Sequence, residues 1–414
     1  MASPPLMKIL RIIARLNVGG PARHVIWLTK ELKDDEFQTV LIAGTVPAGE
    51  ENMGYFAEQN GVKPVFIEEM SRELSLRDAV SLYKIYRRIG HEKPDIIHTH
   101  TAKAGTVGRT AAFLYRWLTW SSLIGRPRKV LIVHTFHGHV FHSYYGKLKT
   151  KVFIAIEKIL ARFATDKIIA ISPQQLKEIH HDTGIGRESQ FAIVPLGIDL
   201  APFCNSKARR RVTREEIEAA EGELLIGLVG RLTEIKNIPL FLKVAALYSR
   251  HFGTDLPKLR FIIVGDGHLR KTLEDEAKHL GIGQNVTFLG NRTDTEVVYA
   301  GLDIVALTSF NEGTPMSLIE AMASGRAVIS TVVGGVVDLL GEIEESRDGF
   351  NVCSRGIGVE PGSAESFING LNYLMKNEKL REIMGARGRK FVETEYSKDR
   401  LVKDIRELYR DLRR

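Results

Sequence analysis

The stretch NEGTPMSLIEAMASGRAVIST, residues 311–331, decides the fold of this chain. A short apolar run, Ile304–Leu307, precedes it and another, Ala327–Ser330, closes it, and continuous apolar runs of this length predict strands buried on both faces. Between them Pro315–Ser324 is predicted to form a helix, with Thr314 as its N-cap and the next residue, a proline, in the first helical position. A helix between two buried strands predicts a βαβ unit in a parallel sheet.

The same alternation of strands and helices extends outward over almost the whole chain. One series of predicted strands spans residues 8–195 and a second spans 224–330, and the segment between them, Leu200–Glu223, is polar with a short acidic helix. We therefore expect an α/β protein with two Rossmann-like domains joined near residue 200. Ligands of such sheets bind beyond the carboxyl ends of the strands, so two facing domains would form a cleft lined by the loops after the strands.

Composition excludes several classes of protein. The chain has 414 residues, of which 44% are hydrophobic and 26% charged, and this balance argues against wholesale disorder. Two cysteines, Cys204 and Cys353, cannot form a disulfide framework or a four-cysteine zinc site, and they fit a reducing compartment. No apolar run reaches the roughly 18 residues that would span a bilayer. Met1–Leu6 is expected to be a disordered leader.

The net charge of +8 comes from one region. Residues 101–156 hold nine lysines and arginines and no aspartate or glutamate, whereas the rest of the chain is near balance. Within this region Ala111–Ile124 contains two of the three tryptophans, and apolar side chains beside cations suit contact with anionic lipid. An ordinary helix with a basic loop is the alternative, and because we find no base-reading motif we expect no nucleic acid partner. The residues assigned to a membrane contact are Trp117, Trp120, Arg126, Arg128 and Lys129.

Two cations follow the first strand of the second domain. Gly230 and Arg231 come directly after the predicted strand Leu224–Val229, and Lys236 follows five residues later. Because a guanidinium offers a planar fork and an ammonium a point charge, this pair suits a diphosphate. Solvated basic residues in an ordinary loop are the alternative.

The helix start within 311–320 is a second candidate for binding an anion. Its free N–H groups would hold a group such as a diphosphate, and Gly313 allows close approach of the backbone. Glu312 precedes the helix and Glu320 lies more than one turn into it, so the two carboxylates would lie at different depths of one pocket. A capped helix with two surface acids is the alternative.

Two glycine-rich turns are ambiguous. Gly265–Gly267 follows a predicted strand but is no dinucleotide fingerprint, because Arg270 stands at the third glycine position. Gly19–Pro21 follows the first strand and could bring backbone amides to a phosphate. A plain turn between a strand and a helix explains each of them as well as a ligand contact does.

Histidines crowd into one short region. We expect the His-x-His pairs to place their members on alternate faces of their strands, so that not all of the rings converge. A zinc cluster is one alternative, but no cysteine or nearby carboxylate completes it, and we therefore expect no metal site. We favour a role for one or two of these residues in contact with a ligand in the cleft. The six histidines are His98, His100, His134, His137, His139 and His142, out of thirteen in the chain.

Several motifs together resemble the GT-B glycosyltransferases of family 4. In the C-terminal half these are GRLTEIKN at 230–237, VGDG at 264–267 and the stretch at 311–331, in which Glu312 and Glu320 have the E-x7-E spacing of that family. In the N-terminal half, NVGGPARHV at 17–25, HTHTAKAG at 98–105, HTFHGHVF at 134–141 and VPLGID at 194–199 are also similar. HTHTAKAG and HTFHGHVF look like bacterial members that build surface polysaccharide or lipid-linked glycans.

The resemblance implies an organisation of the domains. Residues 7–199 would bind the acceptor, residues 200–397 would bind the nucleotide sugar, and the final helix within 398–414 would cross back to the first domain. The two domains would face each other across a cleft, as in the GT-B fold.

The resemblance also implies roles for matching residues. Arg231 and Lys236 would hold the donor diphosphate and stabilise the leaving nucleotide, and Glu320 would bind the ribose hydroxyls. Glu312 would contact the donor sugar, and His137 would lie beside its anomeric centre. Further donor contacts are assigned to Gly19, Gly20, Asp266, Asn291, Arg292, Gly313, Thr314, Pro315, Met316 and Ser317, of which Asn291 and Arg292 would touch the base. The acceptor is assigned to His98, His100 and Lys103.

The activity implied is that of a retaining transferase that needs no metal or other cofactor, and the chain has no Asp-x-Asp pair. We expect a nucleotide-sugar donor, with a UDP-sugar favoured over GDP-mannose, and a glycan or polyprenyl-diphosphate-linked acceptor. The expected location is cytoplasmic, with peripheral attachment to the inner face of the cell membrane. A nucleotide-sugar epimerase of the same fold and a non-catalytic nucleotide-sugar binder are the alternatives.

Overall fold

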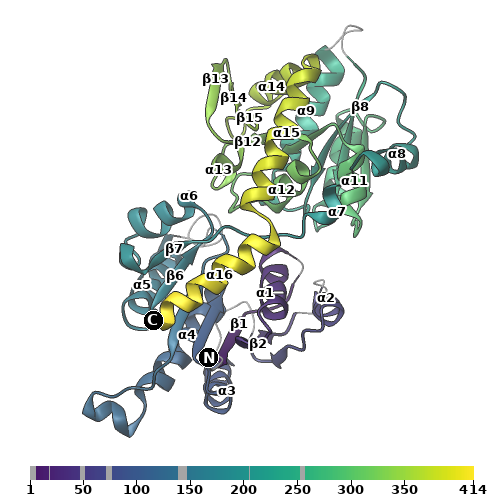
Figure 1. Cartoon of the computed structure of the whole chain (residues 1–414). Coiled ribbons are helices and arrows are strands. Elements are labelled where there is room, and N and C mark those ends of the chain that lie inside the picture. The colour runs from purple at the N-terminus through teal and green to yellow at the C-terminus, as the bar shows by residue number, and fades with distance from the viewer. Residues whose placement is uncertain are drawn as a thin grey trace. The chain divides into compact units, whose positions relative to one another are not determined.

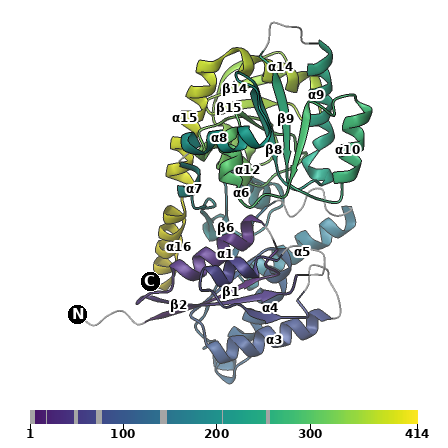
Figure 2. The same ribbon diagram turned by 90° about the vertical axis from the view of Figure 1, so that its right-hand side faces the viewer.

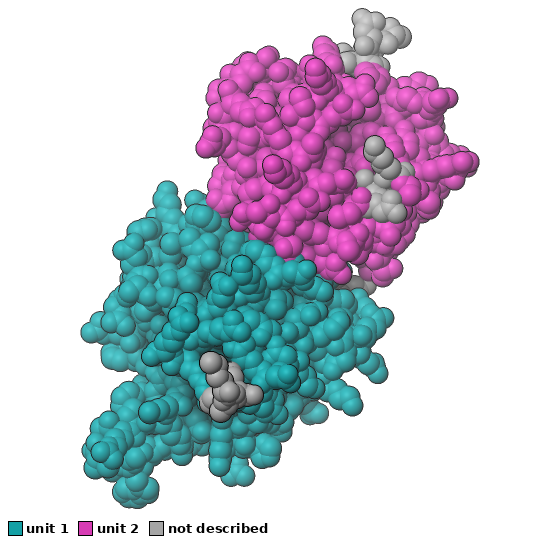
Figure 3. Space-filling model, viewed as in Figure 1, with its two compact units in different colours: residues 1–197, 398–414 teal, residues 198–397 magenta. Residues whose placement is uncertain are grey.

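The computed structural model describes residues 6–17, 19–46, 52–70, 77–138, 147–204, 206–251 and 257–414. The chain forms two compact units, whose elements Figure 1 labels and which Figure 3 shows in different colours. Unit 1 comprises residues 1–197 and 398–414, and unit 2 comprises residues 198–397. The predicted domain boundary lies two residues later in the chain than this division. The expected leader, except for Leu6, falls outside the described residues.

Unit 1 is built on a parallel sheet of seven strands in the order β3-β2-β1-β4-β5-β6-β7. The chain order of the strands reverses between β1 and β4, and the edge of a parallel sheet at such a switch point is where ligands bind. The strands are β1 (Met7–Ile13), β2 (Phe37–Gly44), β3 (Val65–Ile67), β4 (Ile96–His100), β5 (Leu131–Thr135), β6 (Lys167–Ala170) and β7 (Phe191–Ile193).

Helices cover both faces of this sheet (Figure 2). Leu10 and Ile12 of β1 pack in one apolar cluster with α3 and α4, whereas Ile9 and Ile13 point to the opposite face, toward α16 and α1. This alternation follows from the period of two along a strand. The helices are α1 (Gly20–Glu31), α2 (Gly54–Gln59), α3 (Arg77–Glu92), α4 (Ala102–Trp117), α5 (Lys147–Phe163), α6 (Pro173–Leu176) and α16 (Lys398–Arg413), and one π-helical turn, Lys177–Asp182, follows α6.

The last helix of the chain, α16, belongs to unit 1, as the resemblance implied. Its buried residues Leu401, Ile405 and Tyr409 recur every fourth position and form one stripe against β1 and β4. Arg406 and Arg410 on its exposed side pair with carboxylates in the turn that leads into β2. An apolar stripe and flanking ion pairs therefore hold the C-terminus of the chain on the N-terminal sheet.

The two connections between the units run side by side. Ile198 N–H donates to the carbonyl of Tyr396 at 2.8 Å, and Ile198 forms a β-bridge with Ser397. Three residues after Ser397, the guanidinium of Arg400 donates to the carbonyls of Pro195 and Leu196 at 2.8 and 2.6 Å. The chain thus leaves unit 1 and returns to it at one place.

Unit 2 has a sheet of eight strands in the order β10-β9-β8-β11-β12-β15-β14-β13. The six strands from β10 to β15 are parallel, and β14 and β13 add an antiparallel hairpin that the sequence did not predict. The strand order reverses between β8 and β11, which makes a second switch point. The strands are β8 (Leu224–Val229), β9 (Leu259–Val264), β10 (Val286–Gly290), β11 (Ile304–Leu307), β12 (Ala327–Thr331), β13 (Ile343–Arg347), β14 (Phe350–Cys353) and β15 (Gly356–Val359).

The helices of unit 2 complete a second Rossmann-like unit, so the predicted α/β class with two such domains is confirmed. The polar segment after residue 200 forms the helix Ser206–Glu216, which is basic rather than acidic. Arg210 and Arg214 of this helix form ion pairs with Asp303 at 2.5 and 3.2 Å. Asp303 immediately precedes β11, so these pairs attach the helix to the sheet. The helices are α7 (Ala201–Cys204), α8 (Ser206–Glu216), α9 (Ile238–His251), α10 (Arg270–His279), α11 (Thr295–Gly301), α12 (Met316–Ala323), α13 (Val336–Leu340), α14 (Ala364–Lys376) and α15 (Glu378–Glu395). Within the described residues, no helix is sufficiently long and apolar to traverse a bilayer.

Candidate functional site

Lys236 and Glu312 meet at the switch point of unit 2. Lys236 ends a 3-10 turn after β8, and its Nζ donates to Oε1 of Glu312 at 2.6 Å. The hydroxyl of Ser309 donates to the same carboxylate oxygen at 2.5 Å, and the hydroxyl of Thr308 donates to the carbonyl of Lys236 at 2.9 Å. These bonds join the loops after β8 and β11, and they hold an ammonium and a carboxylate at the edge where ligands of such sheets bind.

Glycines allow the loops after β8 and β9 to cross in close contact. Gly265 has φ +128°, and a Cβ placed on it would lie 2.0 Å from the carbonyl oxygen of Gly230. Gly267 faces the carbonyl oxygen of Leu232 in the same way, at 2.4 Å. A side chain at either position would force the two loops apart, so the glycines of the GDG turn keep this edge compact. Arg231, which stands between Gly230 and Leu232 on the loop after β8, is exposed.

The helix that follows β11 begins one residue later than predicted. Pro315, with φ −72° and ψ 114°, is the N-cap, and α12 starts at Met316. The hydroxyl of Thr314 therefore caps nothing: it is buried and has no hydrogen-bond partner within the part of the chain that is described. Proline can occupy the N-cap because the backbone nitrogen of that residue does not donate a hydrogen bond within the helix. The amides of Met316 and Ser317 lie in the first turn, which has no acceptor within the helix.

A close backbone contact holds the start of α12. Gly335 donates its N–H to the carbonyl of Gly313 at 2.9 Å, and a Cβ on Gly335 would lie 2.2 Å from that oxygen. Glu320 is buried further along the same helix. The first-turn amides, an orphaned hydroxyl and the dipole of the helix point to an anion-binding position at this end of α12.

The remaining residues of unit 2 that were predicted to contact the donor lie in the turns after β9 and β10. Asp266 accepts a hydrogen bond from the N–H of Gly267 at 2.7 Å and lies 3.6 Å from Arg270. Arg292 is held by carboxylates of Asp294 and Glu216, at 2.7 and 2.5 Å, and these bonds raise its pKa above the ordinary value. The structure therefore gives Arg292 two ion pairs, and Asn291 precedes it on the exposed surface.

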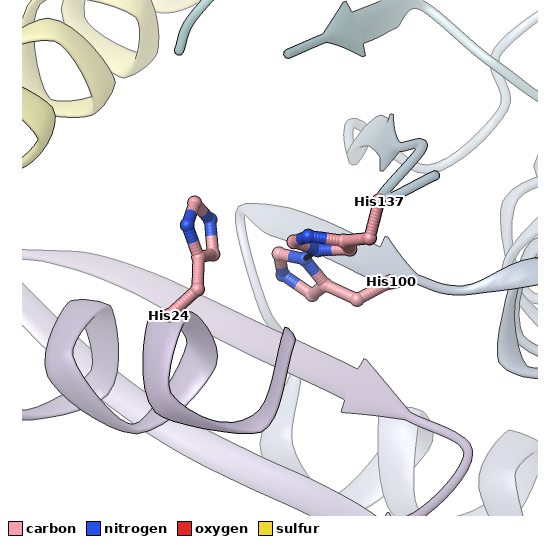
Figure 4. A group of neighbouring side chains, drawn as sticks. All are labelled: His24, His100 and His137. Carbon is pink, nitrogen blue, oxygen red and sulfur yellow. Dashed lines mark hydrogen bonds between the residues drawn. The ribbon is translucent and has the colours of Figure 1, made fainter. Parts of the chain in front are cut away.

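Three histidines converge at the switch point of unit 1 (Figure 4). His24 comes from α1, His100 ends β4, and His137 follows β5, and one ring nitrogen of each lies within 4.8 Å of the others. Nδ1 of His100 and Nε2 of His137 form a hydrogen bond of 2.9 Å. Burial lowers the pKa of His137 to about 3 and lowers the pKa values of His24 and His100 well below 6.5, so the rings are neutral at pH 7.

Sequence reasoning did not consider His24, although it lies in the quoted motif at 17–25. Its ring is 3% exposed, and neither nitrogen has a hydrogen-bond partner among the described residues. Its position in the first turns of a helix that follows the strand β1 was the available signal, because that helix starts at the switch point. Gly19, with φ +155°, is the N-cap of the same helix, and Gly20 is its first residue. Two of the predicted cluster, His139 and His142, fall outside the described residues.

The structure places His98, which was predicted to contact the acceptor, in the interior of unit 1. It is fully buried, and its two nitrogens form hydrogen bonds with the hydroxyls of Tyr409 at 2.6 Å and Thr135 at 2.7 Å. Its ring lies 4.1 Å from that of His100, so the expectation of alternate faces was wrong: residues two apart on a strand share a face. Lys103, which was predicted to contact the acceptor together with His100, is buried and forms an ion pair with Asp78.

The basic region is partly neutralised by carboxylates from outside it. Arg109 is fully buried and donates to both oxygens of Glu157, at 2.7 and 2.6 Å. Arg116 pairs with Asp166, and Lys103 pairs with Asp78 as described above. Counting charges within 101–156 missed these partners, which follow or precede the region. The side chains of Lys147 and Lys149 fall outside the described residues.

The segment after α4 carries an exposed apolar surface. It projects from unit 1 in Figures 1 and 3. Trp120, Leu123 and Ile124 are 89%, 77% and 72% exposed. The assigned cations Arg126, Arg128 and Lys129 are exposed immediately beyond, and Arg128 lies over the ring of Tyr115 at 4.5 Å. Trp117 is partly exposed at the end of the helix.

Comparison with known proteins assigns the chain to a family. Residues 18–202 match the model of Glycosyltransferase Family 4, and residues 209–391 match that of Glycosyl transferases group 1. The chain is 28% identical over 359 residues to the UDP-Gal:alpha-D-GlcNAc-diphosphoundecaprenol alpha-1,3-galactosyltransferase of Escherichia coli, covering 85% of each chain. It is 26% identical to the capsular polysaccharide biosynthesis glycosyltransferase CapM of Staphylococcus aureus, covering 82% of this chain and 83% of CapM.

A solved structure agrees with this assignment at the level of the fold. Anabaena HepE, crystallised with UDP, superposes with a TM-score of 0.76 at 20% identity, covering 98% of this chain and 100% of HepE. The chain belongs to the GT-B glycosyltransferases of family 4.

Proposed function

We propose that this glycosyltransferase moves a hexose from a UDP-sugar to a glycan on a polyprenyl diphosphate, with retention of configuration and without a metal ion. The observation that carries the proposal is the Lys236–Glu312 pair at the switch point of unit 2, 2.6 Å apart and beside the start of α12. The E. coli relative, whose name gives a UDP-galactose donor and a diphosphoundecaprenol acceptor, supports both substrates. HepE, crystallised with UDP-glucose, supports a UDP-sugar over GDP-mannose.

The donor diphosphate would bind between cations and amides of unit 2. Lys236 and Arg231 would face its charge, and the first-turn amides of Met316 and Ser317 would donate to its oxygens. Glu320 would accept from the ribose hydroxyls. Because these fixed positive groups stabilise the departing diphosphate, the reaction needs no divalent cation at the leaving group.

The sugar would react on the face that the diphosphate leaves. The bond from the anomeric carbon to the phosphate oxygen breaks, the acceptor oxygen bonds to that carbon from the same face, and the departing phosphate takes the acceptor proton. Glu312, oriented by Ser309 and Lys236, would accept from hydroxyls of the sugar. His137 would donate or accept at the sugar beside the reacting carbon.

A lipid-linked acceptor would be met at the membrane surface. The exposed side chains of Trp120, Leu123 and Ile124 would enter the headgroup layer, and Arg126 and Lys129 would face anionic lipid. Attachment of this kind is peripheral and would keep the chain at the cytoplasmic face, where the nucleotide-sugar donor and the polyprenyl-linked acceptor would meet.

The test is a donor screen that reads donor binding, nucleotide release and epimer formation. Thermal shift with UDP, GDP, UDP-sugars and GDP-mannose identifies the donor, and free nucleotide is measured with and without a polyprenyl-diphosphate-linked glycan. We expect a UDP-sugar to stabilise the chain and UDP release to require the acceptor and to persist in EDTA. An epimer formed from the donor alone would favour the epimerase alternative. Donor binding without turnover on any acceptor would favour the non-catalytic alternative.

A further inference from the structure

The three histidines at the switch point of unit 1 lie in an arrangement that hydrogen bonding does not explain. His24, His100 and His137 come from three segments that only the fold brings together, and Figure 4 shows the ring of His24 beside the neighbouring rings of His100 and His137. Of the six ring nitrogens, only Nδ1 of His100 and Nε2 of His137 are bonded, and they are bonded to each other. The other four are buried without a hydrogen-bond partner in the described ranges. Buried polar atoms of native proteins are normally satisfied, so within the described residues these four nitrogens lack the partner that such atoms usually have.

Three neutral imidazoles around one point are a set of metal ligands. Imidazole nitrogen is a ligand of zinc, copper, iron and nickel, and three histidines with an open fourth position make one of the known zinc geometries. An anion is a poorer occupant, because buried neutral rings carry no positive charge to attract it. Hard cations such as magnesium prefer oxygen ligands, and no carboxylate belongs to this group of side chains in the described chain.

The spacing of the rings allows an ion to bind with small movements. Zinc at 2.0–2.1 Å from each nitrogen would separate the nitrogens by roughly 3.3 Å. His100 and His137 are already 2.9 Å apart, and the most distant of the three nitrogens lies within 4.8 Å. The ring of His24 can close this gap because no hydrogen bond holds it. His137 is partly exposed, which gives an ion a path from solvent.

We propose that His24, His100 and His137 form a binding site for one zinc ion, and that bound zinc inhibits sugar transfer by engaging the imidazole of His137. The inhibitory part rests on the proposed function, which uses that imidazole at the reacting sugar. The metal is thus no cofactor of the transfer reaction: it competes with the reaction for one side chain. The fourth coordination position is filled by water.

Cobalt binding tests the site without reference to activity. The full chain is stripped with EDTA, and Co²⁺ is added while the visible absorption of tetrahedral cobalt is recorded. We expect one Co²⁺ per chain, displaced by Zn²⁺ and unaffected by excess Mg²⁺. His24→Ala and His100→Ala should each weaken binding by more than about tenfold, since even loss of a group that supports a ligand costs that much. His279→Ala, which removes an exposed histidine of α10, is the matched control and should bind as the native chain does.

Folding of the variants is checked by their melting temperatures. Where His24→Ala melts well below the native chain, His24→Gln replaces it, because glutamine fills the same space without a zinc-binding nitrogen. Absence of tetrahedral cobalt absorption in the native chain, or equal binding by the native chain and both histidine variants, overturns the site.

Transfer assays then separate the site from its effect. Zinc should inhibit the native chain and the His279→Ala control, and EDTA should restore their rate. Whatever rate His24→Ala retains should be insensitive to the same zinc concentration, because zinc then no longer binds the imidazole of His137. Cobalt and zinc binding without inhibition supports the site but contradicts the role of His137 in the proposed function.

Discussion

The hydroxyl of Tyr409 lies 2.6 Å from Nδ1 of His98, although 311 residues separate them in the chain. Both side chains are fully buried, and the other nitrogen of His98 is bonded to Thr135. The guanidinium of Arg11 lies 5.9 Å from the ring of Tyr409 and is itself fully buried. Tyr409 of the last helix thus completes a buried polar cluster with His98, Thr135 and Arg11. This cluster adjoins β4, the strand that also carries His100.

Tyr409→Phe should destabilise unit 1 with little change in packing. The change leaves Nδ1 of His98 buried without a partner, which costs about 1–3 kcal/mol of unfolding free energy. Urea denaturation at pH 7 measures it. Tyr83→Phe on the exposed side of α3 is the control, and its midpoint should match the native chain. Equal midpoints for all three proteins would show that the hydrogen bond contributes nothing.

Lys236→Ala should abolish most of the transfer activity. Removal of one charge that stabilises a leaving group costs about 10²–10³-fold in rate. The donor should also stabilise the variant less in a thermal-shift assay. Lys243→Ala, on the exposed surface of the next helix, should retain the native rate. A native rate for Lys236→Ala would refute the donor assignment.

Acid should weaken the docking of α16 through Glu36. Hydrogen bonds from Arg410 and Arg406 lower the pKa of Glu36 below its ordinary value of 4.5. A carboxyl whose pKa is lower in the folded state stabilises the fold above pH 4.5, and this contribution is lost as pH falls through the folded-state pKa. Asp34 shares Arg406, so the loss involves both acids.

Melting temperatures between pH 7 and pH 3 test this dependence. Glu36→Gln should melt below the native chain at pH 7, and the difference should shrink as the pH falls. Glu58→Gln, an exposed residue of α2, is the control and should follow the native curve. A constant difference between Glu36→Gln and the native chain at every pH would contradict the prediction.

The exposed segment after α4 should determine binding to membranes. Replacement of Trp117, Trp120, Arg126 and Arg128 together removes both the apolar and the charged contacts. Co-sedimentation with vesicles containing anionic lipid should fall strongly, and the native chain should bind less at high salt because the electrostatic part is screened. Ile343→Ser, an exposed apolar residue of unit 2, is the control. Unchanged sedimentation of the fourfold variant would remove the membrane contact.

Features that depend on local sequence could be predicted. The βαβ motif from Ile304 to Ser330 could be predicted from two apolar runs with a helix between them. It forms as expected apart from the start of α12. The hairpin of β13 and β14 could not be predicted in this way, because every residue of Ile343–Arg347 is exposed and the strand has no apolar pattern. Its formation depends on pairing with a neighbour rather than on burial.

Features that depend on distant residues could not be predicted. Arg109 looked like part of a basic surface, yet its partner Glu157 lies 48 residues away and the pair is buried. His98 looked like a ligand-binding residue, yet Tyr409 from the last helix covers it. The proximity of His24 to His100 and His137 is visible only in the fold, because α1 and the ends of β4 and β5 are far apart in sequence. Motifs indicated which loops lie at the switch points of the two sheets, but not which side chains are already engaged in hydrogen bonds or ion pairs.

The return of α16 to unit 1 determines the order in which the protein can be completed during synthesis. Leu401, Ile405 and Tyr409 are synthesised after all of unit 2, yet they cover apolar side chains of β1 and β4. Residues 198–397 have all been synthesised before then and hold every strand of their own sheet. The part of the chain made first is therefore the last to finish folding. A message truncated by a late stop codon would yield a protein whose oldest strands stay uncovered and accessible to chaperones and proteases.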